Sequence, residues 1–303
     1  MELRTEPVIW TSEYKELPTE LITSYLGISK EVWPNGIDNS PESYKRRGFM
    51  KIPSLIPQMD VFSANYLAYS LKRKEFDGTI LESNGKSVRS VFNVQQNCPE
   101  LVKLLYTKKI HDYARLILGS DVYIHQFHIN YKSAFYGGGF FWHSDYTFWH
   151  WDDGMPSPRA LSFVIPLDKV GYLNSPTYIS PGSHMYYGHS HYFRDQENSV
   201  ESSAEEDIKH DEHDLGSATD QQLRSIGKFG MTPLVGQEGD VFIMDANMLH
   251  MSMPNYGFQD RPVAFLCLNS VDNLLEEPYS GRARRPEYLT TRDVDNNKRE
   301  CFV

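Results

Sequence analysis

The chain has few cysteines, no long apolar run and no apolar leader. Its 303 residues include three cysteines, Cys98, Cys267 and Cys301, which lie far apart and form no CxxC pair. This spacing argues against a disulfide framework or a zinc ribbon and is typical of a reducing compartment. No apolar stretch approaches the roughly 20 residues of a membrane-spanning helix, and residues 1–7 contain no apolar signal segment. We therefore expect a cytoplasmic protein without a membrane partner.

An excess of positive charge is also absent. Lysine and arginine together number 30 against 40 acidic residues, so the formal net charge is −10. This balance argues against a nucleic-acid partner, which requires a basic face, although a locally basic pocket can still bind a small acidic molecule. With 40% hydrophobic residues the chain can bury a sizeable core, and its length is compatible with a single domain over residues 1–303.

The N-terminal part of the chain predicts helices. Candidates are residues 13–30, a short helix leading into a strand within 43–56, and a helix over 58–76. In residues 99–118, leucine and isoleucine recur at three- and four-residue spacing, which predicts one helix. Asn97 suits its cap, Pro99 its first turn and Gly119 the position after its end. We expect this helix to pack on the outside of a sheet.

From residue 121 the hydrophobic pattern changes to a period of two. Strands are predicted at 121–130, 160–167, 177–179, 241–244 and 262–269. In the first of these strands, one face is predicted to carry Val122, Ile124, Gln126, His128 and Asn130. Short strands between glycine and proline turns predict a mainly β fold with flanking helices, a sandwich or jelly roll. The acidic segment 194–228 predicts an exposed insertion or a mobile lid, and residues 276–303 are expected to wrap the surface.

A His-x-Asp pair lies within the aromatic-rich segment 139–156. On an extended chain His143 and Asp145 point to the same side. An imidazole and a carboxylate on one face are two members of a facial triad of two histidines and one carboxylate, which binds Fe(II) and leaves coordination positions open. The pairs His150–Asp152 and His210–Glu212 have the same spacing and remain alternatives. His210 lies in the acidic segment, where a solvated surface is favoured.

The third ligand must come from a distant segment, and His250 is the candidate. It follows the predicted strand 241–244, and a closed sheet can bring the ends of distant strands together. Arg261 opens the next strand and is suited to bidentate capture of a carboxylate. Lys132 and Ser252 can reach the same cavity. Each of these residues alone is more often a surface residue, but together they indicate a metal with a carboxylate-bearing co-substrate.

Several motifs then identify a family resemblance. They are the segments 88–92, 118–126 and 181–184, the run Phe141-Trp142-His143-Ser144-Asp145 with Trp149-His150, the run Asp153-Gly154-Met155-Pro156, and residues 269–271. Over roughly residues 45–290 the chain resembles the phytanoyl-CoA dioxygenase superfamily of Fe(II)/2-oxoglutarate-dependent oxygenases, and most closely the bacterial ectoine hydroxylases. The resemblance implies a double-stranded β-helix, which is a cupin-like jelly roll.

The resemblance also implies the roles of individual residues. It implies Fe(II) at His143, Asp145 and His250, and contacts to 2-oxoglutarate from Lys132, Ser252 and Arg261. It implies substrate contacts at four further positions, namely Gln126, Phe140, Trp149 and Phe265. The implied enzyme uses O2 and 2-oxoglutarate to hydroxylate an unactivated C–H bond, and it releases succinate and CO2.

Two substrate-lining positions depart from the ectoine hydroxylases. Their run Asp-Phe-Glu-Thr-Trp is here Asp145-Tyr146-Thr147-Phe148-Trp149, so Phe148 replaces a small hydroxyl residue. Val263 stands where the family has an asparagine. Both changes remove a polar contact, and such contacts discriminate between substrates. We expect one side of the substrate site to be more apolar than in an ectoine hydroxylase.

The expected reaction is hydroxylation of a small amino-acid-like or natural-product substrate. Ectoine 5-hydroxylation proper, or desaturation or cyclisation by a tailoring oxygenase of the same family, are alternatives within this chemistry. A metal-dependent lyase and a non-catalytic jelly-roll protein are alternatives from other classes. The sequence leaves open whether the protein is a monomer or a homodimer.

Overall fold

The computed structural model describes residues 8–9, 41–187 and 230–297. The helix expected at 13–30, the acidic segment 194–228 and the pair His210–Glu212 lie outside the described residues. Within the described residues, no helix is both long and apolar enough to cross a membrane.

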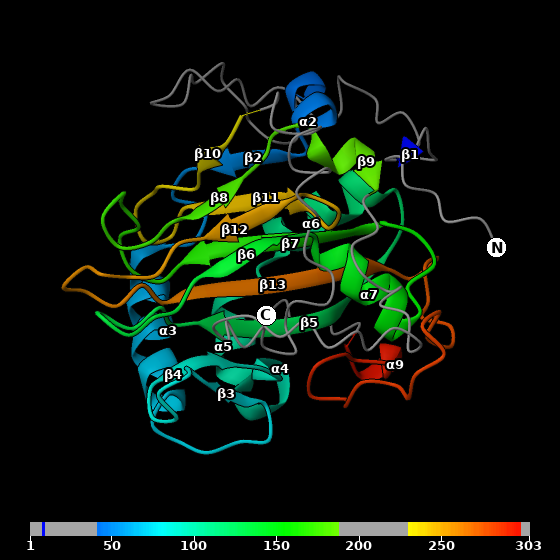
Figure 1. The fold of residues 1–303 in the computed structure, drawn as a ribbon. Coiled ribbons are helices and arrows are strands. Elements are labelled where there is room, and N and C mark those ends of the chain that lie inside the picture. The colour runs from blue at the N-terminus through cyan, green and yellow to red at the C-terminus, as the bar shows by residue number, and fades with distance from the viewer. Residues whose placement is uncertain (1–7, 10–40, 188–229, 298–303) are drawn as a thin grey trace, which may run out of the picture.

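Two antiparallel sheets form the body of the molecule (Figure 1). In spatial order, the seven-stranded sheet contains β2 (Phe49–Ile52), β11 (Val241–Asp245), β7 (Ala160–Pro166), β13 (Val263–Ser270), β5 (Val122–Asn130), β4 (Val88–Val91) and β3 (Thr79–Leu81). The four-stranded sheet contains β10 (Thr232–Pro233), β8 (Thr177–Ile179), β12 (His250–Ser252) and β6 (Phe140–His143). A further pair joins β1 (Val8–Ile9) to β9 (Tyr186–Tyr187). The predicted jelly roll with flanking helices is confirmed.

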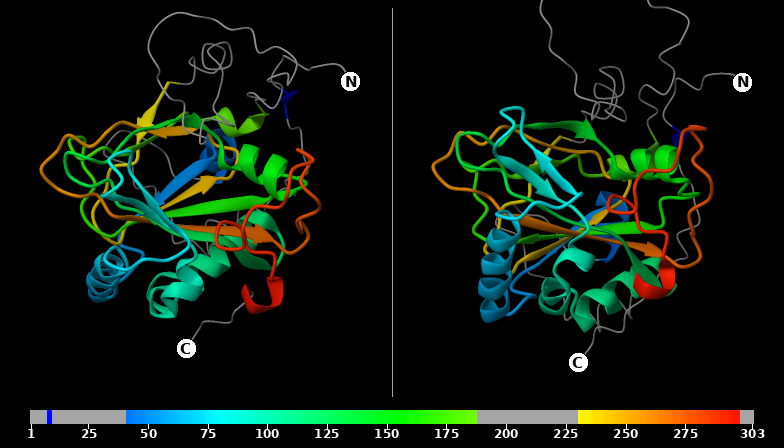
Figure 2. Two further views of the ribbon diagram at one scale, coloured as in Figure 1. Left: turned by 60° about the horizontal axis from the view of Figure 1, so that its bottom comes forward. Right: turned by 90° about the horizontal axis from the view of Figure 1, so that it is seen from below.

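Helices cover the outer face of the large sheet (Figure 2). The principal ones are α3 (Gln58–Leu71), α5 (Pro99–Leu105) and α6 (Lys108–Leu118), and α6 contacts β5, β7 and β13. The other helical elements are α2 (Pro41–Arg47), α4 (Val94–Asn97), α7 (Asp145–Asp153), the 3-10 turn η1 (Ser183–Met185) and α9 (Val294–Asn297). The helix α7 lies apart from this layer and follows directly on β6, so it belongs to the interior side of the fold.

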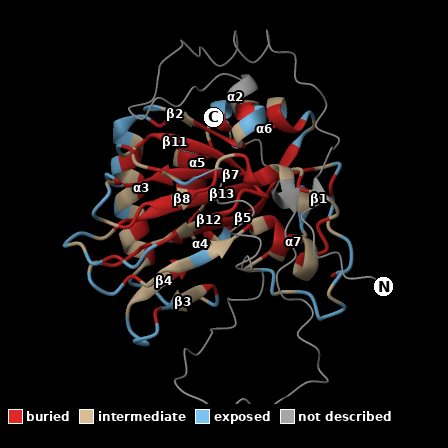
Figure 3. Cartoon of the chain, turned by 45° about the horizontal axis from the view of Figure 1, so that its top comes forward, coloured by how far each residue is buried: buried red, intermediate tan, exposed pale blue. Residues whose placement is uncertain are grey.

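The central strands of the large sheet, β11, β7, β13 and β5, are buried on both faces, while the outer strands β3 and β4 are partly exposed (Figure 3). Along β13, Ala264, Leu266 and Leu268 pack into the cluster beneath the helices. Their neighbours Val263, Phe265 and Cys267 face the second cluster, which lies between the sheets. This alternation follows from the two-residue period of a strand, and the inward-facing set is the one that can line a site.

A β-bulge in β5 corrects the predicted pattern of that strand. Cys267 pairs with Gln126 while Leu268 pairs with Ile124, so His125 is an extra residue without a partner on β13. The bulge exchanges the two faces of the strand. Val122 and Ile124 pack under the helices together with Phe127 and Ile129, and not with Gln126 and His128 as the simple alternation predicted. The bulge therefore turns the second half of β5 so that its polar residues face the interior.

The helix predicted over 99–118 is in fact two helices. Pro99 occupies the first turn of α5 as expected, and Gly119 ends α6 with a positive φ of 66°. Between them Tyr106 leaves helical geometry, and the hydroxyl of Thr107 accepts a hydrogen bond from the backbone N–H of Ile110. Threonine side chains compete with the helical backbone in this way and favour the N-cap. The apolar spacing continued through the break, which is why the pattern did not reveal it.

Replacement of Thr107 by alanine tests this cap. The Thr107→Ala variant should lose about 1 kcal/mol of unfolding free energy, the usual contribution of an N-cap hydroxyl. Thr107→Ser retains the hydroxyl and should be close to the wild type. Chemical denaturation of the three proteins measures the difference, and equal stability of the alanine and serine variants would contradict the assignment.

Candidate metal centre

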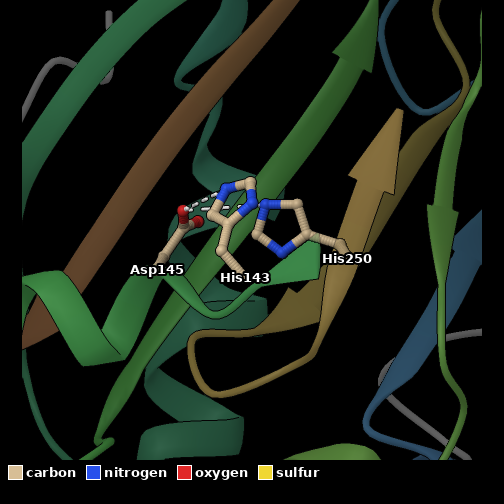
Figure 4. Close-up of side chains that lie close together, drawn as sticks. All are labelled: His143, Asp145 and His250. Carbon is tan, nitrogen blue, oxygen red and sulfur yellow. Dashed lines mark ion pairs between the residues drawn. The ribbon is translucent and has the colours of Figure 1, made fainter. Parts of the chain in front are cut away.

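Strand pairing brings two histidines together in the smaller sheet. In the antiparallel ladder between β6 and β12, His143 and His250 are direct partners, and their ring centroids are 4.2 Å apart. Partners across two strands have their side chains on the same face. The two imidazoles therefore lie side by side, although more than a hundred residues separate them in the sequence (Figure 4).

The third member of the group, Asp145, is the first residue of α7. The expectation that His143 and Asp145 share a strand is therefore wrong in detail, because β6 ends at His143. Ser144 between them is extended, with φ −116° and ψ 131°, so the alternation that aims both side chains to one side is kept. One carboxylate oxygen, Oδ1, lies 3.9 Å from His143 Nε2 and 3.7 Å from His250 Nε2.

These distances fit a single metal ion. The three ligand atoms all lie within 4.8 Å of one another, and among the described residues no other group of three such side chains has this property. Two ligands of one ion, each about 2.2 Å from it, lie at most about 4.4 Å apart, and the distances from Asp145 Oδ1 to the two Nε2 atoms are below this limit. His143, Asp145 and His250 thus form the group that the sequence predicted.

Hydrogen bonds prepare each of the three side chains for ligation. The Nδ1–H groups of His143 and His250 donate to the carbonyl oxygens of Phe141 and Met248, at 2.6 and 3.0 Å. Both rings therefore present an unprotonated Nε2 to the site. Burial lowers the pKa of His143 to about 4, so the imidazole stays neutral. Ser162 donates to Asp145 Oδ2 at 3.2 Å and leaves Oδ1 available to a metal.

A cationic region adjoins this group. Arg261 is buried, and its Nε has no hydrogen-bond partner among the described residues. Burial lowers its pKa to about 9, which reflects the cost of desolvating a guanidinium that has no counter-ion among the described residues. Ser252, also buried, pairs with Phe140 one step along the ladder that joins the two histidines. An anion beside Arg261 would compensate the buried charge.

Lys132 lies in the same region but is already engaged. Its ammonium donates to the carbonyls of Gly138 and Met253, the latter at 3.0 Å, and lies 4.9 Å from the ring centroid of Phe140. Burial, Arg261 and Arg89 lower the pKa of Lys132 to about 6. Lys132 thus ties the start of β6 to the end of β12. Arg261, by contrast, has a donor group, Nε, that lacks a hydrogen-bond partner among the described residues.

Two phenylalanine side chains flank His143. The rings of Phe140 and Phe148 lie 6.3 and 6.1 Å from that of His143, and the guanidinium of Arg89 covers Phe140 at 3.8 Å. Val263 is buried at the start of β13, and Trp149 packs edge-on against His125 at 4.7 Å. Phe140 and Phe148 thus make the surroundings of His143 largely apolar.

His128 was not among the predicted site residues. Its ring is stacked between Phe92, at 4.6 Å, and Phe265, at 5.0 Å, and its buried Nδ1 has no hydrogen-bond partner among the described residues. Its pKa is lowered to about 4 by burial, and the charge of Asp145 acts on it in the opposite direction. The sequence contained one signal for His128, because the strand pattern placed it on the same face as Gln126. No comparable signal pointed to Ser162, which donates to Asp145.

His150, the alternative to His143, lies elsewhere. Its Nδ1–H donates to the carbonyl of Met155 at 2.7 Å, and its ring stacks on Tyr279 at 4.4 Å. These contacts hold the last turn of α7. His150 is therefore not a member of the group formed by His143, Asp145 and His250.

Comparisons with known proteins point to one family. The model of the phytanoyl-CoA dioxygenase (PhyH) family matches residues 44–263. An ectoine dioxygenase of Nocardia farcinica is 32% identical over 293 residues, which cover 95% of this chain and 96% of the relative. An ectoine dioxygenase of Streptomyces avermitilis is 32% identical over 83% of this chain and 85% of its own length.

Solved structures agree with these relatives. The crystal structure of EctD from S. alaskensis with 2-oxoglutarate and 5-hydroxyectoine has a TM-score of 0.71 and 28% identity, and the match covers 88% of this chain and 89% of that chain. The structure of EctD from S. alaskensis with bound Fe has a TM-score of 0.70 and 29% identity over 86% of each chain.

Substitution of each ligand tests the metal group. His143→Ala, Asp145→Ala and His250→Ala should each weaken Fe(II) binding by at least about a hundredfold, because even residues that only orient ligands contribute ten- to hundredfold. His150→Ala is the matched control and should bind Fe(II) like the wild type. Anaerobic titration with Fe(II) measures the affinities. Loss of binding in the control with retention in His143→Ala would mean that the other His-x-Asp pair holds the metal.

Proposed function

Because the chain belongs to the phytanoyl-CoA dioxygenase family and is an iron- and 2-oxoglutarate-dependent dioxygenase, we propose that it hydroxylates an unactivated C–H bond of a small amino-acid-like substrate related to ectoine. The observation that carries the proposal is the convergence of His143, Asp145 and His250 within 4.8 Å. The known activity of the relatives supports the chemistry, and the lining residues of this chain guide the choice of substrate.

The proposed iron ligands are His143, Asp145 and His250. The bound metal would supply the oxidising chemistry, in which 2-oxoglutarate and O2 are converted to succinate and CO2 as one oxygen atom is transferred to the substrate. The protein contributes a fixed arrangement of ligands, because the carbonyls of Phe141 and Met248 hold the two imidazoles in one tautomer. A carboxylate at Asp145 disfavours a halogenase, whose site has a small residue at this position.

Arg261 is the proposed anchor of 2-oxoglutarate. A buried guanidinium without a counter-ion is suited to the distal carboxylate of the co-substrate, which it can bind through two parallel hydrogen bonds. Ser252 and Lys132 are proposed as further contacts. Nζ of Lys132 donates to two carbonyls, so its contribution would be to hold the start of β6 and the end of β12 in place beside the co-substrate.

The substrate is proposed to lie against Gln126, Phe140, Phe148, Trp149, Val263 and Phe265. Phe148 and Phe140 flank His143 and would exclude water from the metal. With phenylalanine and valine at positions 148 and 263, the site offers fewer polar contacts than an ectoine hydroxylase. We therefore propose a substrate of similar size to ectoine with an apolar flank, and ectoine itself as the second candidate.

The remaining properties are also proposals. The unpaired cysteines Cys98 and Cys267 support a reducing, cytoplasmic location. The net charge of −10 supports the absence of a nucleic-acid partner. We propose that residues 1–303 form one domain and that the protein acts as a monomer or a homodimer.

Removal of the guanidinium tests the anchor. Arg261→Ala should raise the KM for 2-oxoglutarate about ten- to a hundredfold, since hydrogen bonds to charged groups contribute about 1.5–3 kcal/mol. Lys132→Met should raise the same constant less. The measurement is the rate of 2-oxoglutarate decarboxylation against its concentration, and a larger effect in Lys132→Met would identify that residue as the anchor instead.

The reaction class is tested by a substrate panel. The protein is supplied with Fe(II), 2-oxoglutarate and O2 together with ectoine, proline, other free amino acids or small natural products, and succinate is measured. We expect substrate-dependent succinate and a product heavier by one oxygen atom. A product lighter by two hydrogen atoms would indicate a desaturase or cyclase. Conversion of substrate without succinate would contradict the proposal and favour a metal-dependent lyase.

A further inference from the structure

Residues 285–292, here called the C-terminal arm, cross the end of α7 and the bulge of β5. The arm lies beyond residues 44–263, which the family model matches. The backbone N–H of Thr291 donates to the carbonyl of His125 at 3.0 Å, and the side chain of Gln95 donates to the Thr291 hydroxyl at 3.0 Å. Figures 1 and 2 place the segment before α9 beside α7 and the beginning of β5.

A buried ion pair fixes the arm to α7. Arg285 donates from Nε and Nη2 to the two oxygens of Asp153, at 2.8 and 2.5 Å, and Asp153 is fully buried. Arg292 donates to the backbone carbonyl of Asp153 at 2.7 Å. His125 also lies near this pair, with its Nε2 3.8 Å from Asp153 Oδ2. Bidentate pairs of this kind are strong and directional.

The arm reaches the interior at Gln126. A row of cross-strand partners leads there from the metal group: Ser162, which donates to Asp145, pairs with Cys267, and Cys267 pairs with Gln126. Neighbouring strands are about 4.8 Å apart, so Gln126 lies roughly two strand spacings from Ser162 on the same inner face. Its Nε2 donates to the carbonyl of Leu289 in the arm at 2.6 Å.

This hydrogen bond determines how the Gln126 amide is oriented. A carbonyl accepts only from the –NH2 end of an amide, so Leu289 directs Gln126 Oε1 away from the arm. Gln126 is 8% exposed, and among the described residues Oε1 accepts no hydrogen bond. This oxygen is not among the fully enclosed polar atoms that lack a partner, so it remains open to a donor group from outside the protein.

We propose that the C-terminal arm is part of the substrate site: Leu289 fixes the Gln126 amide so that Oε1 accepts a hydrogen bond from an N–H or O–H group of the substrate, and the Asp153–Arg285 pair holds the arm in place. The assignment of Gln126 to the substrate rests on the proposed function. The attachment of the arm does not, so the two parts can be tested separately.

Hydrogen–deuterium exchange tests the attachment without a substrate. In the variant Arg285→Gln, amides of residues 286–292 should exchange at least about tenfold faster than in the wild type, because a segment held by few contacts opens locally. Peptides covering residues 143–147 should be unchanged. Arg284→Gln is the matched control, since Arg284 pairs with Glu277 at the surface, where ion pairs contribute little. Equal exchange of the arm in wild type and Arg285→Gln would overturn the attachment.

Kinetics with ectoine as the probe test the role at the site. Arg285→Gln should raise the KM for ectoine about tenfold or more, through loss of an oriented hydrogen bond, and should increase the succinate formed per hydroxylated product. Fe(II) affinity and the KM for 2-oxoglutarate in the absence of ectoine should not change. Arg285→Lys keeps the charge and should recover part of the affinity.

The outcomes separate the inference from the proposed function. If the wild type does not turn over ectoine, the proposed substrate is wrong, and the exchange experiment still decides the attachment. If KM values for ectoine and 2-oxoglutarate rise together, the arm has only a general structural role and the inference is overturned. If Arg285→Gln does not fold, Arg285→Lys is measured in its place: smaller changes in the same direction are expected, and exchange and KM for ectoine equal to those of the wild type would overturn the inference.

Discussion

The register between β6 and β12 is the constraint on which the site depends. His143 and His250 are direct partners in this ladder, and a shift of one residue would turn one imidazole to the opposite face of the sheet. The strand that carries His143 then passes through the extended Ser144 into α7, so the first helical residue, Asp145, faces the same point. The His-x-Asp spacing suggested that a single strand carries both His143 and Asp145. Instead, the β6–β12 ladder positions His143, and the first residue of α7 supplies Asp145.

Desolvated charge organises the rest of the interior. Arg261 and Lys132 are both buried, and burial lowers the pKa of each, to about 9 and about 6. Backbone carbonyls accept hydrogen bonds from the buried amine of Lys132, while Nε of Arg261 has no hydrogen-bond partner among the described residues. An anionic co-substrate would complete this arrangement, and the two phenylalanine side chains that flank His143 would, by excluding water, strengthen its attraction to the guanidinium.

The sequence predicted the convergence of His143, Asp145 and His250, the jelly roll and most strands, because histidine spacing, two-residue periodicity and family motifs are local signals. It did not predict features that arise from long-range pairing. The bulge at His125 depends on the partner strand β13, the break at Thr107 is hidden by continuous apolar spacing, and the stacking of His128 depends on Phe92 and Phe265. The attachment of the C-terminal arm to Asp153 likewise joins residues 132 positions apart.

The most direct test of the account is a crystal structure of the protein with Fe(II) and 2-oxoglutarate prepared without oxygen. The account predicts one ion within about 2.0–2.2 Å of His143 Nε2, His250 Nε2 and an Asp145 oxygen, with the distal carboxylate of 2-oxoglutarate against the guanidinium of Arg261. An ion bound elsewhere, or a co-substrate carboxylate directed away from Arg261, would contradict it.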